Sequence, residues 1–237
     1  MSDHIVKSFD DELAHLKTRL VQMGGMTENA LDQATLALST CDTELADKII
    51  AEDDKIDAIQ LEVEDRAITL IARRQPMALD LRAIIVAIHV SSDLERVGDL
   101  AKNIAKRTHA VNETPPKRIM AGYARMGLLA LEQLKGVIDA YVQGDAEKAL
   151  AVWRSDEDLD GLYNSIFREL LTYMMEDPRM IGLCIHLLFC AKNIERIGDH
   201  TTNIAENIYF LVHGKPITES RPKRDLTSSM PIDNLVK

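Results

Sequence analysis

Two stretches of the sequence match each other closely, one in each half of the chain. Residues 93–105 read DLERVGDLAKNIA, and residues 193–205 read NIERIGDHTTNIA. Chance does not readily produce such a match in the same register, so it indicates an internal duplication with a period of about 100 residues. We therefore expect two copies of one structural unit.

The spacing of apolar residues around these stretches predicts helices. Between Leu13 and Leu31, apolar side chains recur at intervals of three, four and seven positions, which places them on one face of a helix. The expected helices cover residues 9–39, 43–74, 79–111 and 118–142, then one from the Gly144–Asp145 turn to about 176 and a last one that ends near 213. The fold class should be all-α, with two tandem three-helix bundles related by a pseudo-two-fold internal duplication.

Prolines and polar segments suggest where the units begin and end. Thr114, Pro115 and Pro116 interrupt the helical pattern between the two copies. We expect a first repeat over residues 1–113 and a second over 114–213. Beyond Gly214 the sequence lacks periodicity, so 214–237 is expected to be a flexible C-terminal tail.

The composition supports this fold class and narrows the function. Of the 237 residues, 46% are hydrophobic and only 4% aromatic, a balance that favours helices with aliphatic cores. The formal net charge is -10, with 38 acidic against 28 basic residues. Because phosphate binding needs clustered Lys and Arg, nucleic acid is not expected as a partner.

Cysteine usage and the absence of targeting signals indicate a cytoplasmic protein. Cys41, Cys184 and Cys190 are odd in number and form no Cys-x-x-Cys motif, so neither a disulfide framework nor a thiolate zinc site is expected. The N-terminus lacks the basic and apolar regions of a leader, and the longest apolar run, residues 181–191, is too short to span a bilayer.

The matched stretches carry acidic stripes. Side chains at positions i, i+4 and i+8 share a helix face, and here all three positions offer oxygen ligands. The members of the two stripes are Glu95, Asp99 and Asn103, and Glu195, Asp199 and Asn203. Carboxylates one turn apart repel each other unless a positive charge lies between them.

The preceding helices add a second set of acids. In an antiparallel helix pair, two residues equally far from the connecting turn lie side by side. Counting from Pro76 and from the 177–178 turn pairs Glu95 with Asp57, Asp99 with Asp53, Glu195 with Asp160, and Asp199 with Asp156. The two hairpins therefore predict the same acidic cluster independently.

Such clusters suit metal ions. Converging carboxylates without Cys fit hard or borderline cations such as Mg²⁺, Mn²⁺, Fe or Ca²⁺ better than a structural zinc site. We expect a multinuclear divalent or trivalent centre of Fe, Mn, Mg or Zn, whose identity the sequence leaves open. The alternative is a solvated acidic face balanced by Arg96 and Arg196, which as pure donors are not ligands themselves.

Two other sequence features, and one further functional hypothesis, leave alternatives open. Gly98 and Gly198 interrupt helices where Ala would be favoured by about 1 kcal/mol, which indicates either tight helix contact or close approach of a ligand. Residues 12–15 form one Glu-x-x-His, an element of di-iron carboxylate bundles, so a di-metal helical-bundle enzyme is a weaker alternative. A metal-independent helical scaffold is the third.

At these residues the sequence resembles the PhoU family. The resemblance rests on the repeated Glu-Arg-Val/Ile-Gly-Asp signature and on residues 75–82, QPMALDLR, and it covers about residues 5–213. The second unit departs from the latter segment, reading DPRMIG at 177–182, and Asn193 stands where the first repeat has Asp93. We therefore do not expect the second unit to duplicate the role of Asp80 and Arg82, and we expect Asn193 to weaken or alter the second metal site.

The resemblance implies a regulator and not an enzyme. Family members couple the phosphate ABC transporter to a sensor histidine kinase, repress the phosphate-starvation response and restrain phosphate uptake. The implied partners are that kinase, the transporter ATPase and a second copy in a homodimer, with only peripheral attachment to membrane complexes. The family's multinuclear metal clusters correspond here to Glu95, Asp99, Glu195 and Asp199. No catalytic nucleophile with its base and no phosphate loop accompanies them in the sequence.

Overall fold

The computed structural model describes residues 2–111, 115–219 and 221, with side chains from residue 9 onward. All of its regular elements are helical: α1 Ser2–Thr40, α2 Thr43–Arg74, α3 Leu79–Thr108, α4 Lys117–Gln143, α5 Ala146–Glu176, the 3₁₀ turn η1 Pro178–Met180, and α6 Ile181–His213. The predicted all-α class is confirmed.

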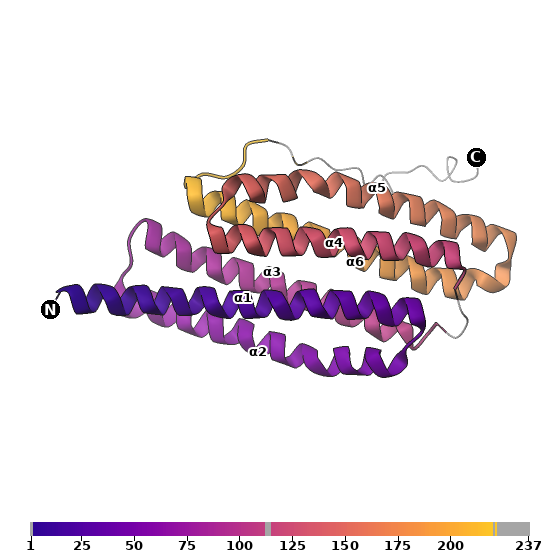
Figure 1. The fold of residues 1–237 in the computed structure, drawn as a ribbon, viewed down its shortest axis with the longest axis horizontal. Helices are drawn as coiled ribbons and strands as arrows, with labels where there is room; N and C mark the ends of the chain where they lie inside the picture. The colour runs from indigo at the N-terminus through magenta and orange to yellow at the C-terminus, as the bar shows by residue number, and fades with distance from the viewer. Residues whose placement is uncertain (1, 112–114, 220, 222–237) are drawn as a thin grey trace.

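The helices form two antiparallel three-helix bundles that lie side by side. In Figure 1, α1 to α3 make up the lower bundle and α4 to α6 the upper one. The bundles join through α1 packed on α4 and α3 packed on α6. A single apolar core runs through both, and its largest fully buried side chains include Met23, Leu31, Tyr123, Met126 and Trp153.

The second helix of each bundle begins at the same kind of cap. The Asp42 carboxylate accepts a hydrogen bond from the Leu45 amide at 2.9 Å, and Asp145 accepts one from the Lys148 amide at 3.0 Å. Such caps satisfy amides that the first turn of a helix leaves unpaired. Because both repeats use them, the two hairpins start in the same register.

The observed bounds differ from the expected ones at three places. α1 begins at Ser2, earlier than expected, and α3 ends at Thr108 and not at 111. The turn η1 was not expected; there the Asp177 carboxylate accepts a hydrogen bond from the Arg179 amide at 3.0 Å. The predicted boundary at 113 and 114 and most of the predicted tail, residues 220 and 222–237, lie outside the described residues.

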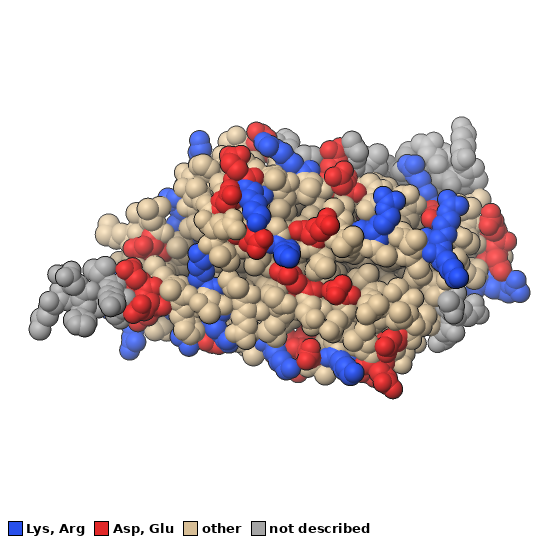
Figure 2. Space-filling model, viewed as in Figure 1, with Lys and Arg blue, Asp and Glu red and all other residues tan. Residues whose placement is uncertain are grey.

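The surface carries both signs of charge. Figure 2 shows Asp and Glu side chains interspersed with Lys and Arg over the face formed in front by α1 and α4. Within the described ranges, no helix is both long enough and apolar enough to cross a bilayer. The three cysteines are free thiols, and Cys184 and Cys190 are buried.

Candidate metal centres

The first acidic cluster lies between α2 and α3 and consists of Asp53, Asp57, Glu95 and Asp99. Lys102 of α3 forms ion pairs with both Asp53 and Asp99, to the latter at 3.5 Å. These two carboxylates therefore meet at one ammonium group, as counting from the α2–α3 turn suggested. Asp53 is only 3% exposed, so its charge is held away from water.

The charges of this cluster disfavour one another. The pKa of Asp57 is raised by burial first and then by Asp53, against the opposing effect of Lys102. Burial likewise raises the pKa of Glu95, and Asp99 adds to the rise while Arg96 opposes it. Burial is thus the main cause of both shifts, and the neighbouring carboxylates add to it.

One oxygen of the first cluster has no donor. Asp57 Oδ1 is buried and accepts no hydrogen bond from any described residue. Asp53, Asp54 and Asp57 can each bring one carboxylate oxygen within 4.8 Å of the others. An unpaired buried oxygen beside converging carboxylates fits a hard cation, which binds oxygen ligands and needs no hydrogen-bond donor.

The second acidic cluster lies between α5 and α6 and consists of Asp156, Asp160, Glu195 and Asp199. It is more deeply buried, because Asp156, Asp160 and Glu195 are each 4% exposed or less. The pKa of Asp156 is raised by burial, although the Arg221 guanidinium opposes the rise. Lys192 pairs with Glu195 at 2.8 Å.

Arg221 bridges two carboxylates of the second cluster. Its Nε and Nη2 donate to Asp156 Oδ2 at 3.0 and 2.6 Å, and Nη2 also donates to Asp199 Oδ1 at 2.7 Å. Lys102 of the first repeat corresponds by the 100-residue period to Thr202. The Thr202 hydroxyl donates to the Asp199 carbonyl at 2.7 Å and brings no charge, so the second cluster receives its cation from the C-terminal segment.

The two asparagines of the stripes lie in different surroundings. Asn103 is exposed on α3. Asn203 donates from Nδ2 to Asp93 of α3 at 3.3 Å, and His200 Nδ1 lies 2.9 Å from the same carboxylate oxygen. Asp93 and Asn203 thus connect the two repeats.

Tight helix contact accounts for the two mid-helix glycines. A Cβ on Gly98 would lie 3.1 Å from Ile56 Cδ1 and 3.5 Å from Asp53 Oδ1. A Cβ on Gly198 would collide with Leu159 Cδ2 and lie 3.1 Å from Asp156 Oδ1. The glycines let α2 and α5 approach closely enough to bring their aspartates onto the stripes.

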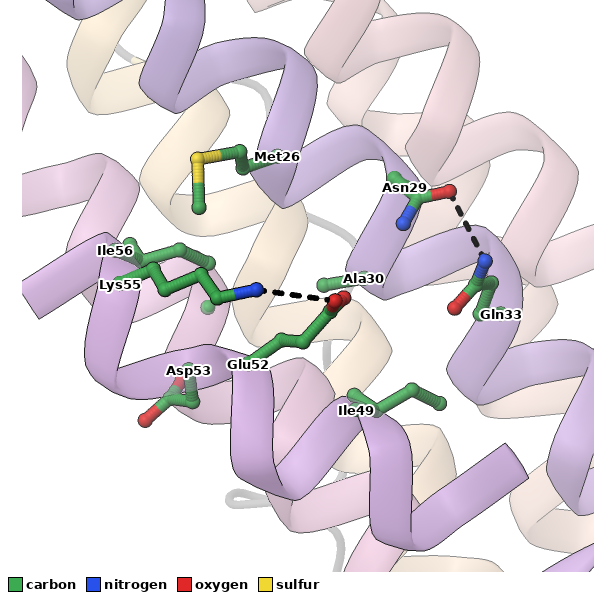
Figure 3. A pocket seen from close by; sticks show the side chains of 10 residues that line it. Met26, Asn29, Ala30, Gln33, Ile49, Glu52, Asp53, Lys55 and Ile56 are labelled. Carbon is green, nitrogen blue, oxygen red and sulfur yellow. Dashed lines mark hydrogen bonds and ion pairs between the residues drawn. The ribbon is translucent and has the colours of Figure 1, made fainter. Parts of the chain in front are cut away.

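A pocket of about 270 Å³ adjoins the first cluster between α1 and α2. Figure 3 shows Asn29 and Gln33 of α1 on one side, joined by a hydrogen bond of 3.2 Å, and the Glu52–Lys55 ion pair on the other. Asp53 lies at its edge.

Glu12 of the single Glu-x-x-His pairs with Arg74, which belongs to neither cluster. Both Glu12 carboxylate oxygens accept hydrogen bonds from Arg74 at 3.1 Å, which ties the start of α1 to the end of α2. This ion pair gives Glu12 a structural partner. The di-iron alternative gains no support from it.

Sequence reasoning missed three members of these sites. Asp54 could have been found as the neighbour of Asp53, and Lys102 as the residue three positions after Asp99 on the same face. Arg221 had no such signal, because no helical period relates it to the acids that it contacts. Arg96, expected as a balancing charge, pairs with Glu95 and Asp99 at 3.4 and 3.5 Å while 58% of its side chain stays exposed.

Comparison with known proteins identifies one family. The family model described as the PhoU domain matches residues 20–108 and 123–208. A protein of Caulobacter vibrioides named phosphate-specific transport system accessory protein PhoU homolog is 49% identical over 96% of this chain and 100% of its own. The Escherichia coli protein named phosphate-specific transport system accessory protein PhoU is 34% identical over 91% of this chain and 89% of its own.

Two solved structures share the fold. The crystal structure of PhoU from Pseudomonas aeruginosa is 36% identical, with a TM-score of 0.84 over 87% of this chain and 100% of that one. The phosphate transport system regulatory protein PhoU from Streptococcus pneumoniae is 30% identical, with a TM-score of 0.81 over 89% and 100%.

Proposed function

The chain belongs to the PhoU family, and from that premise we propose that it is a metal-binding regulatory adaptor of phosphate-specific transport. Its relatives are named as accessory or regulatory proteins of phosphate transport, and the general role of this chain is the same. The finer proposal is negative regulation: the protein couples the phosphate ABC transporter to a sensor histidine kinase and restrains both the starvation response and uptake.

One observation carries the metal part of the proposal. Each hairpin holds four carboxylates of which at least one is almost fully buried, and in each a basic side chain bridges an aspartate of one helix to an aspartate of the next. Buried charges of one sign require compensation. Two clusters built alike in a duplicated fold support a cation-binding function over a solvated acidic face.

The residues that would hold the ions follow from the geometry. In the first repeat these are Asp53, Asp57, Glu95 and Asp99, with Asp54 at the rim; in the second they are Asp156, Asp160, Glu195 and Asp199. A bound cation supplies positive charge there and removes the repulsion between the facing helices. The chain's own contribution is to fix α2 against α3, and α5 against α6, so that each hairpin presents one defined surface to a partner.

Elemental analysis and partner binding test the proposal together. Protein purified without chelator is compared with a Glu95→Ala/Asp99→Ala/Glu195→Ala/Asp199→Ala variant for metal content, helicity by circular dichroism, and binding to the kinase sensor region and the transporter ATPase. We expect the variant to keep its helicity and to lose both metal and binding. Wild-type protein that carries no metal and still binds both partners would leave the stripes as a direct protein contact.

A separate outcome addresses the alternatives. A di-metal enzyme would show turnover that disappears with Glu95→Ala, whereas a metal-independent scaffold would bind its partners equally well in every variant. Asp10→Ala, on the exposed start of α1 and outside both clusters, serves as the control for the loss of surface charge.

A further inference from the structure

The C-terminal strap, defined as residues 214–219 and Arg221, turns back along the second bundle after α6 ends. Figure 1 shows the chain reversing direction at the end of α6 and passing over the beginning of α5. Asp199 lies 14 residues before His213, or about 21 Å of helix at 1.5 Å per residue. Eight extended residues span up to about 26 to 29 Å, so the strap reaches the second cluster without strain.

The strap also covers a polar cleft between the repeats. Its Pro216, Ile217 and Glu219 line a cavity of about 530 Å³ whose other walls come from α3, α5 and α6. Ile217 packs against the core, and Glu219 pairs with Arg154 of α5 at 3.6 Å. Trp153, the only tryptophan of the chain, lines the same cleft and donates to Glu206 at 2.9 Å.

The two clusters differ in how their countercharge is held. Lys102 is anchored on α3 and can leave the first cluster only by changing its side-chain conformation. Arg221 stands on a strap that departs from α6 at Gly214, whose φ of +73° marks a sharp turn. The guanidinium is 17% exposed and its Asp156 partner 2%, so the contact is nearly enclosed.

The second cluster contains a further group without a partner. Gln133 of α4 is 4% exposed and donates from Nε2 to Ser155, but its Oε1 accepts no hydrogen bond from the described residues. That oxygen lies 3.5 Å from the Cβ position of Gly198, and Asp156 Oδ1 lies 3.1 Å from the same point. With Arg221 in place this inner oxygen stays unsatisfied, which indicates that the cluster suits a ligand other than the guanidinium.

We propose that Arg221 and a divalent cation compete for the second cluster, so that cation binding there releases the C-terminal strap and opens the cleft over Trp153. The reason is that Asp156 Oδ2 and Asp199 Oδ1 are both the acceptors of the guanidinium and two of the oxygens that would bind the ion. A guanidinium next to a bound dication is repelled by it. Among the described residues no comparable strap contacts the first cluster, where the bridging cation is Lys102 of α3 itself. The inference rests on the proposed metal binding.

Arg221→Gln separates the two occupants. The full-length protein is freed of metal with chelator and titrated with Mn²⁺ while three quantities are followed: Mn²⁺ affinity, acrylamide quenching of Trp153, and hydrogen exchange of a peptide that covers residues 214–221. Arg154→Gln is the matched control, because it removes a positive charge that contacts the strap but not the cluster.

We expect Arg221→Gln to bind Mn²⁺ at least about tenfold more tightly than wild type, and Arg154→Gln to change the affinity by less than about threefold. Without metal, the strap of Arg221→Gln should exchange faster and its Trp153 should be quenched more than in wild type. Saturating Mn²⁺ should bring wild type to the same state.

The outcomes distinguish this inference from the proposed function. If Mn²⁺ binds wild type and Arg221→Gln equally and the strap stays protected, metal binding stands and the competition is overturned. If Mn²⁺ binds neither protein, both the metal-binding proposal and the competition fail, whatever the strap does. An additional equivalent of Mn²⁺ bound by Arg221→Gln and not by wild type supports the competition in its strongest form.

Discussion

The guanidinium of Arg82 on α3 lies where a Cβ on Gly214 would have to be, with Nη1 2.7 Å from that position. Arg82 also donates to the Leu211 carbonyl at 3.3 Å and lies over the Phe210 ring. A positive charge at the C-terminal end of α6 is favourable for the helix dipole. The first repeat thus caps the last helix of the second repeat at the point where the strap begins.

Gly214→Ala should therefore destabilise the protein more than a substitution at a comparable turn. Both Gly144 and Gly214 have positive φ, but a Cβ on Gly144 meets nothing within 4 Å. We expect Gly144→Ala to cost about 1 kcal/mol from the left-handed backbone alone and Gly214→Ala about 1 to 2 kcal/mol more, because Arg82 must move. Urea unfolding measures both, and equal losses would show that the Arg82 contact contributes nothing.

Lys102→Gln should destabilise the metal-free protein. Its pKa is raised, with the hydrogen bond to Asp53 as the largest cause, so its stabilising contribution is fully present at neutral pH and is lost only as the pH rises through the folded value. Removing it leaves Asp53 buried beside other acids, at a cost of about 1 to 3 kcal/mol after allowance for the partial exposure of Lys102.

The control for Lys102→Gln is Lys55→Gln. Lys55 pairs with Glu52 at 3.3 Å, but both side chains are more than half exposed, so the free energy of unfolding should change by less than about 0.5 kcal/mol. Saturating Mn²⁺ should reduce the loss in Lys102→Gln. If the loss in free energy of unfolding is the same with and without Mn²⁺, Lys102 stabilises the protein through packing and not through its charge.

Gly198→Ala should be more damaging than Gly98→Ala. The added methyl group at 198 meets Leu159, which is fully buried, and Asp156 of the second cluster. We expect a loss of about 1 to 3 kcal/mol there, and a change within about 1 kcal/mol at 98, where higher helix propensity offsets a milder contact with Ile56. Thermal unfolding of the two variants, measured without metal, checks the order.

Cys190 should make the protein sensitive to alkali. Burial raises the pKa of its thiol to about 12 from an ordinary value of 9.0, although Arg107 opposes the rise. The unfolded chain loses this proton first, so stability falls between about pH 9 and 12, by up to about 1.4 kcal/mol per pH unit. In Cys190→Ala, the midpoint of urea unfolding should depend less on pH over this range than it does in wild type. The Cys41 thiol, which is not fully buried, is present in both proteins.

The helices were predictable because their ends carry local signals. Asp42, Gly144 and Pro76 each mark an end through a cap, a left-handed turn or a missing amide, and these properties belong to single residues. The pairing of Asp53 with Asp99 was predictable too, since an antiparallel hairpin leaves one register for residues equally far from its turn. The facing aspartates of this hairpin therefore follow from the sequence alone.

The contacts between distant segments were not predictable in this way. Arg221 reaches Asp156 across 65 positions, and nothing periodic connects an extended strap to the helix beneath it. The link between Asn203 and Asp93 depends on how the two bundles pack, which the pattern within one repeat does not determine. The stripe within the second repeat therefore gave no signal for the contact of Asn203 with the first repeat.

The contact of Asp93 with His200 and Asn203 makes the two halves of the chain non-interchangeable. The first repeat carries Leu100 where the second has His200, and the second carries Asn193 where the first has Asp93. A chain built from two first repeats would set a partly buried carboxylate against leucine, and one built from two second repeats would leave the imidazole without its acid. The two repeats have thus diverged into complementary halves. They pack together through a contact that two identical copies of either repeat would lack.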